Sequence, residues 1–111
     1  NIAPQPEGSI ASPAVARQIQ TMLRKVVKEG TGTRANVPGL EAAGKTGTAQ
    51  TGDGVPHSWF IGFAPAENAT LALAVIVENG GLGGRAAAEV AHALFLAARK
   101  KKYFNSDGER Q

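Results

Sequence analysis

The run TLALAVIV, from Thr70 to Val77, constrains the fold more than any other part of the chain. It is too short for a typical helix and rich in β-favouring residues, so it predicts a strand. Because side chains alternate across a strand, this run is apolar on both faces. We therefore expect a sheet in which this strand is covered on both sides, with a neighbouring strand hiding its hydrophobic edge.

Two helices flank the predicted sheet. Ser12 and Pro13 supply an N-cap and a first helical residue, and an apolar stripe of helical period follows them up to about Gly30. That stripe predicts a helix with one buried face. The second helix is expected from about Arg85 to Lys102; it is apolar nearly all round, which predicts a buried helix.

Two further strands are expected between these helices. The Gly-rich segment 30–39 predicts a loop, and residues 40–50 and 57–65 predict strands joined by the turn at 51–56. The resulting fold class is α+β: a helix, three antiparallel strands and a helix, with the helices packed on the sheet.

Composition excludes several kinds of function. The 111 residues suffice for one domain or part of one. There is no cysteine and there are two histidines, so we expect no disulfide and no metal site. The net charge of +3 owes much to the basic run 99–102, a solvated helix end; with 5% aromatic residues, nucleic-acid binding is not expected. No apolar run is long enough to span a bilayer.

The segment GLEAAGKTGTAQ, residues 39–50, fits two motifs. Residues 39–46 match the phosphate-binding P-loop, which requires a strand before the glycines and a helix starting at Lys45 and Thr46. The glycines at 47, 52 and 54 exclude a helix of useful length, so a P-loop NTPase is a remote alternative. Lys45-Thr46-Gly47 on a strand followed by a hairpin instead matches the K-T-G of serine acyl-transfer enzymes.

The chain resembles the C-terminal part of a penicillin-binding protein transpeptidase domain of the class B, monofunctional type. The resemblance rests on AGKTGTA at 43–49, HSWFIGFAP at 57–65 and the loop GTGT at 30–33. It implies that the three strands belong to a β-lactamase/transpeptidase-like five-stranded sheet with helices packed on it. Residues 1–11 are then an extended lead-in, 12–102 the C-terminal portion of that domain and 103–111 a flexible tail.

Physical reasons support the residues that the resemblance singles out. Lys45 would supply positive charge for a substrate carboxylate and help to keep a nearby amine neutral. The hydroxyls of Thr46 and Thr48, two residues apart on one strand face, could both donate to that carboxylate. Gly47 points the other way and permits close packing. By the resemblance, the backbone N–H of Thr48 forms half of an oxyanion hole, and Gln50 touches substrate.

Two of the family's three motifs are missing. No serine in the chain begins S-x-x-K, which bears the nucleophile, or S-x-N. The chain is therefore expected to be a C-terminal fragment or cleaved segment, inactive alone, whose partner is the remainder of the same domain. The missing strands would cover the hydrophobic edge of residues 71–77.

The resemblance implies a serine D,D-transpeptidase that cross-links peptidoglycan stem peptides and is acylated by β-lactams, without metal or cofactor. It further implies a membrane-anchored enzyme facing outward, acting in cell shape or division, with the anchor outside this chain. A serine β-lactamase and a non-catalytic β-lactam sensor remain alternatives, because the residues that separate them lie outside these 111.

Other residues have simpler interpretations. Trp59 and Phe60 are expected in the core. A Ser58-His57-Asp53 triad is rejected, because neighbours on a strand point to opposite faces. His92 is expected to contact Glu89 one helical turn away.

Overall fold

The computed structural model describes residues 8–52, 54–82 and 84–101. The predictions for residues 1–7, for Asp53, for Lys102 and for the tail at 103–111 lie outside these ranges. The elements are helix α1 (Pro13–Glu29), a 3-10 turn η1 (Thr33–Ala35), strands β1 (Ala43–Ala49), β2 (His57–Ala64) and β3 (Leu71–Val77), and helix α2 (Ala86–Lys100).

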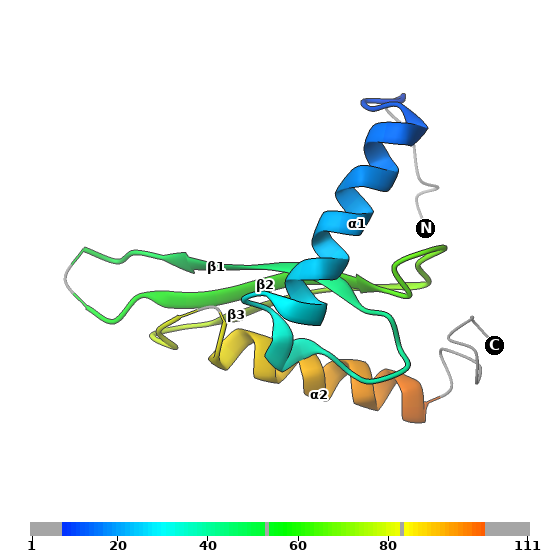
Figure 1. Ribbon diagram of the computed structural model, residues 1–111. Coiled ribbons are helices and arrows are strands. Elements are labelled where there is room, and N and C mark those ends of the chain that lie inside the picture. Colours follow the sequence, from blue (N-terminus) through cyan, green and yellow to red (C-terminus); the bar gives the residue numbers. More distant parts are fainter. Residues whose placement is uncertain (1–7, 53, 83, 102–111) are drawn as a thin grey trace, which may run out of the picture.

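The predicted order of elements and the α+β class are confirmed. The three strands form one antiparallel sheet in the order β1-β2-β3, so β1 and β3 are its edges (Figure 1). The first strand is shorter than predicted. Gly39 and Glu41 have positive φ angles of 85° and 61°, which turn the backbone out of extended conformation before β1 begins.

Helix α2 covers one face of the sheet and forms most of the core with it. Figure 1 shows α2 lying along the sheet, and Phe95 of the helix and Phe60 of β2 are both fully buried. The loop from η1 to β1 closes the core at its side through Val37 and Leu40. Small residues at Ala87, Ala88, Ala91 and Ala98 let α2 lie close to the strands.

The opposite face of the sheet is open along β3 and at Ile61 of β2, among the residues that the structure describes. Ile61 and Ile76 are exposed there, the latter by 71%, together with Ala72 and Ala74 of β3. The prediction that β3 is covered on both sides is therefore wrong for this part of the chain. One helix layer is present where a doubly apolar strand requires two.

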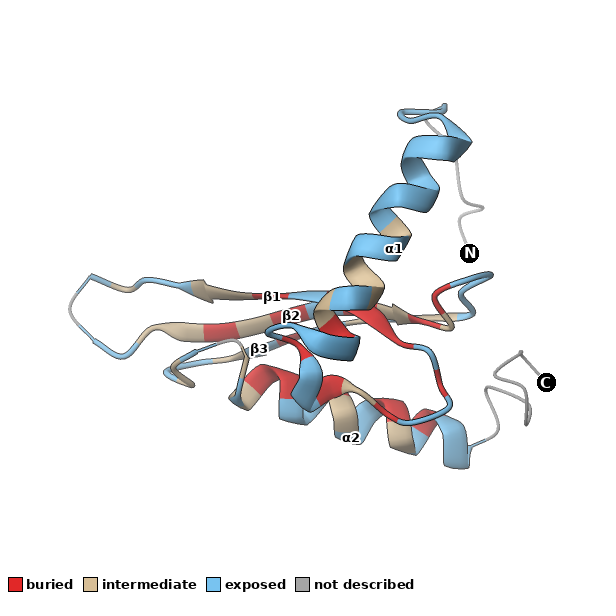
Figure 2. Cartoon of the chain, in the orientation of Figure 1, coloured by how far each residue is buried: buried red, intermediate tan, exposed pale blue. Residues whose placement is uncertain are grey.

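Helix α1 begins as predicted but does not bury its apolar stripe. The Ser12 side chain accepts a hydrogen bond from the N–H of Val15, which caps the helix. Figure 2 shows the helix projecting from the sheet with most of its surface exposed; Met22 is 63% exposed and Val27 alone is buried in the helix. Only the last turn of α1 reaches the described core.

Helix α2 is likewise buried on one side only. Val90 and Leu94 are exposed, although the composition of this helix predicted burial all round. These two residues are four apart and lie one turn from each other beside the stripe of buried residues that packs on the sheet.

Ser58 of β2 caps α2 from a distance. Arg85, at the N-cap position, makes no side-chain cap, and the fully buried Ser58 hydroxyl instead accepts from the N–H of Ala87 at 3.0 Å. The same hydroxyl donates to the carbonyl of Leu82 at 3.0 Å. One side chain thus joins β2 to the loop before α2 and to the start of the helix.

Replacing Ser58 with alanine is expected to reduce the free energy of unfolding by about 2 kcal/mol, because it leaves a buried N–H and a carbonyl without their partner. Urea unfolding of the complete protein measures this change. Ser9, whose exposed hydroxyl bonds only locally, to the carbonyl of Ala11, is the matched control, and its alanine variant should differ from wild type by less than about 0.5 kcal/mol. Equal stability of the two variants would contradict the capping role of Ser58.

Candidate functional site

The Lys45-Thr46-Gly47 motif lies in the middle of β1, an edge strand. In the register of the sheet, Thr46 is opposite Phe60 and Thr48 is opposite Ser58, so both threonines lie on the face that α2 covers. Lys45 and Gly47 lie on the open face by alternation. The motif is therefore on a strand, and the next element along the chain is strand β2. A P-loop requires a helix that starts at Lys45 and Thr46, so this arrangement rules out the P-loop alternative.

Lys45 is exposed at this edge. Its side chain folds back on the strand, and Nζ donates to the carbonyl of Thr46 at 2.9 Å. This contact holds the ammonium group beside the backbone of the motif. The position places one positive charge where a ligand approaching the edge of β1 would meet it.

Thr46 is buried, with 6% of its surface exposed. Its hydroxyl lies 2.8 Å from the hydroxyl of Thr31, in the loop that follows α1. The loop GTGT at 30–33 contributed to the family resemblance, but the sequence predicted no role for the Thr31 side chain. A contact between residues fifteen apart, in a segment without strand or helix periodicity, leaves no pattern in the sequence.

Gly47 gives room for Trp59. A Cβ atom at Gly47 would collide with the indole ring of Trp59, which lies directly across the ladder on β2. The prediction of close packing at this glycine is therefore supported. Trp59 itself is only partly buried, unlike Phe60, so the expectation that both are core residues holds for Phe60 alone.

Thr48 and Gln50 mark the end of the strand. Thr48 is half-buried on the same face as Thr46. Gln50 is exposed and lies one residue beyond the end of β1, so its side chain is not fixed on the strand face by the ladder.

The structure also shows the hydrogen-bond partners of His57, Ser58 and His92, the other polar side chains considered in the sequence. His57 Nδ1 accepts from the N–H of Asn79 at 2.9 Å, while Ser58 binds on the opposite face, so the rejection of a His57-Ser58 pair is supported. The predicted contact of His92 with Glu89 is replaced: His92 Nδ1 lies 3.0 Å from the carbonyl of Asn36, and Glu89 pairs with Arg34 at 2.8 Å. Packing of the η1 loop against α2 supplies both partners.

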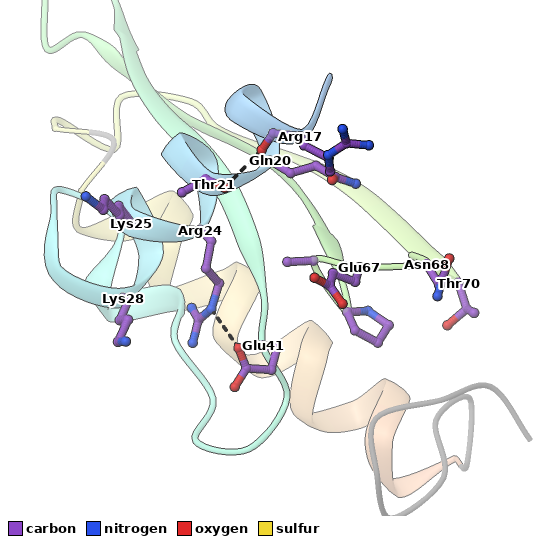
Figure 3. Close-up of a pocket in the computed structure, with 12 residues that line it drawn as sticks. Arg17, Gln20, Thr21, Arg24, Lys25, Lys28, Glu41, Glu67, Asn68 and Thr70 are labelled. Carbon is purple, nitrogen blue, oxygen red and sulfur yellow. Dashed lines mark hydrogen bonds and ion pairs between the residues drawn. The ribbon is translucent and has the colours of Figure 1, made fainter. Parts of the chain in front are cut away.

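A groove of about 840 Å³ lies beside α1, away from the motif (Figure 3). Basic and polar side chains of α1 line one wall, and residues 65–68 and 70 line another. Two of the lining residues form an ion pair: Arg24 pairs with Glu41 at 3.1 Å, and Arg24 also donates to the carbonyl of Ala42 at 2.8 Å. No residue of the Lys45-Thr46-Gly47 motif lines this groove, so we assign it no chemistry.

In the described ranges, no group of three or more His, Cys, Asp or Glu side chains could hold a metal ion. No helix among the residues placed by the structure has the length and apolarity needed to cross a membrane.

A K-T-G motif on the edge strand of a sheet with a helix on one face defines the class: an α+β unit built like the sheet of penicillin-binding domains. A family model described as penicillin binding protein transpeptidase domain matches residues 3–96. The chain belongs to the family of penicillin-binding protein transpeptidase domains.

Individual relatives agree with this assignment. The chain is 36% identical over 107 residues to the peptidoglycan D,D-transpeptidase PbpA of Mycolicibacterium smegmatis, covering 88% of this chain and 22% of that protein. Penicillin-binding protein A of M. tuberculosis, solved as an imipenem acyl-enzyme complex, matches with a TM-score of 0.69 and 38% identity over 80% of this chain and 20% of that one.

The transpeptidase domain of FtsI4 from Legionella pneumophila matches with a TM-score of 0.73 and 33% identity, over 79% of this chain and 36% of that one. The chain thus spans about one fifth of the length of the PbpA relatives, 22% and 19%. The chain therefore corresponds to only part of those proteins, and its open sheet face and the exposed stripe of α1 belong to that part.

Proposed function

We propose that this chain acts as part of a serine D,D-transpeptidase that cross-links peptidoglycan stem peptides. A serine oxygen bonds to the carbonyl carbon of the penultimate D-alanine, the peptide bond to the last D-alanine breaks, and that D-alanine leaves with the serine proton on its amine. An amine of a second stem then attacks the acyl carbon, the ester bond breaks, and the proton returns to the serine.

In this proposal the chain supplies the wall on which the substrate lies. An extended peptide can add to the free edge of β1 through backbone hydrogen bonds. Lys45 provides positive charge for the substrate carboxylate, and the hydroxyls of Thr46 and Thr48 donate to it. The backbone N–H of Thr48 stabilises the oxyanion, and Gln50 contacts substrate beyond the end of the strand.

The nucleophile in this proposal lies outside these residues. The sequence contains neither S-x-x-K nor S-x-N, and the PbpA relatives are about four times as long as this chain, since 88% of the chain matches 22% of one and 78% matches 19% of the other. The remainder of the same domain is therefore the proposed partner. It would carry the serine, two further strands of the sheet, and the surfaces that cover the open face of β3 and the stripe of α1.

Peptidoglycan and β-lactams are the proposed ligands, without a cofactor. Support comes from the names of the relatives and from the imipenem acyl-enzyme of the M. tuberculosis protein. We also propose an outward-facing location, with a membrane anchor on another part of the protein and a role in cell shape or division. A serine β-lactamase or a β-lactam sensor is kept as the alternative, because both could use the same wall.

The observation that carries the proposal is the placement of K-T-G on an exposed edge strand, with one threonine hydroxyl held by Thr31. Labelling with fluorescent penicillin, read by intact mass, tests it. We expect no adduct on these 111 residues alone and a stable adduct on the complete protein. Absence of an adduct on the complete protein would contradict the proposal, and rapid loss of the adduct by hydrolysis would favour the β-lactamase.

A further inference from the structure

The Thr31 hydroxyl reaches the K-T-G motif from a separate loop. It is 2.8 Å from the hydroxyl of Thr46, and it is exposed whereas Thr46 is buried. Thr31 therefore lies next to the buried hydroxyl of the motif and is itself accessible to solvent.

The backbone around Thr31 is held from both sides. On one side the N–H of Gly32 donates to the carbonyl of Val26 in α1 at 2.9 Å, which ties the loop to the end of that helix. On the other side Gly84, ahead of α2, lies so close that a Cβ atom there would be 2.8 Å from the Thr31 carbonyl oxygen. The backbone at Thr31 thus lies between the end of α1 and the segment that precedes α2, and both limit its position.

The hydroxyls of Thr31 and Thr46 each have one hydrogen to donate, so the direction of the hydrogen bond between them decides which hydrogen is free for a ligand. If Thr46 donates to Thr31, it has no hydrogen left for an anionic ligand. If Thr31 donates to Thr46, the Thr46 hydrogen is available, and the chain of two hydrogen bonds strengthens the second one.

We propose that Thr31 is a positioning residue, which donates to Thr46 and so directs the Thr46 hydrogen at a substrate carboxylate. This inference rests on the proposed function. It assigns selectivity for carboxylate-bearing substrates to a pair of hydroxyls, one of which lies outside the K-T-G motif.

Acylation of the complete protein by benzylpenicillin and by its methyl ester tests the inference. In Thr31→Val the second-order acylation rate constant for benzylpenicillin should fall about 3- to 10-fold, the effect of one hydrogen bond. The methyl ester, which has no carboxylate, should change less than about twofold. Thr31→Ser keeps the hydroxyl and should recover the benzylpenicillin rate. Thr33→Val, an exposed threonine in the same loop, is the matched control and should behave like wild type.

A double-mutant cycle with Thr46→Val separates positioning from direct contact. If Thr31 acts through Thr46, the Thr31→Val change should have no further effect in the Thr46→Val protein. An undiminished loss in that background, an equal loss with the methyl ester, or no loss in Thr31→Val would overturn the inference. Should Thr31→Val fail to fold, Thr31→Ser and Thr31→Ala give the same comparison with smaller side chains. A wild-type protein that forms no penicilloyl adduct would instead disprove the proposed function itself.

Discussion

Replacing Lys45 with alanine is expected to lower the rate of penicillin acylation of the complete protein by about 100- to 1,000-fold, as does the loss of one preorganised electrostatic group in other acyl-transfer sites. The ammonium group is fixed beside the Thr46 carbonyl, so its charge need not be reoriented when a carboxylate binds at the edge of β1. Rapid-mixing measurement of the acylation rate over a range of penicillin concentrations tests the prediction.

Lys28 provides the matched control for Lys45. It is an exposed lysine of α1 that lines the groove beside that helix and takes no part in the motif. Lys28→Ala should keep the wild-type acylation rate, which shows that a loss in Lys45→Ala is local and not an effect of net charge. Because Lys45 is exposed, its removal should leave the unfolding midpoint unchanged, and similar rates for the two variants would disprove the assignment of Lys45 to the site.

The sequence predicted the elements and their pairing because local patterns determine them. The short, continuous apolar run at 71–77 and the turn residues between 51 and 56 indicate strands and a hairpin without reference to distant contacts. Burial was predicted less well. The stripe of α1 and the second face of β3 have the composition of buried surfaces, but composition cannot say whether the covering layer belongs to the same segment.

In the candidate site, too, the sequence predicted the residues of a local motif but not those that depend on distant contacts. Lys45, Thr46 and Gly47 could be found from the motif and placed on a strand by the hairpin that follows. Thr31 could not be given a role, since its contact with Thr46 depends on how the loop after α1 returns to the sheet. The cap that Ser58 provides for α2 was missed for a similar reason: it joins residues 29 positions apart.

Replacing Gly44 with alanine is expected to destabilise the complete protein by about 3 kcal/mol, near the upper end of the range for overpacking a core. Gly44 precedes the motif on β1 and lies opposite Gly62 on β2. An added Cβ atom would collide with the backbone carbonyl of Ile61 and with the ring of Phe60. Neither group can give way cheaply, because the carbonyl belongs to the ladder and Phe60 is fully buried.

Alanine substitutions at two other glycines, Gly47 and Gly54, are expected to cost less stability than Gly44→Ala. Gly47→Ala meets the rim of Trp59, a partly exposed ring that can swing outward, so its cost in stability should be smaller than that of Gly44→Ala. Gly54→Ala meets nothing closer than the Thr51 hydroxyl at 3.5 Å and should change stability by less than about 0.5 kcal/mol. Urea unfolding of the three variants tests the order. A Gly44→Ala protein as stable as Gly54→Ala would show that Phe60 does not fill the space over β1, and the link between the core and the position of the K-T-G strand would have to be abandoned.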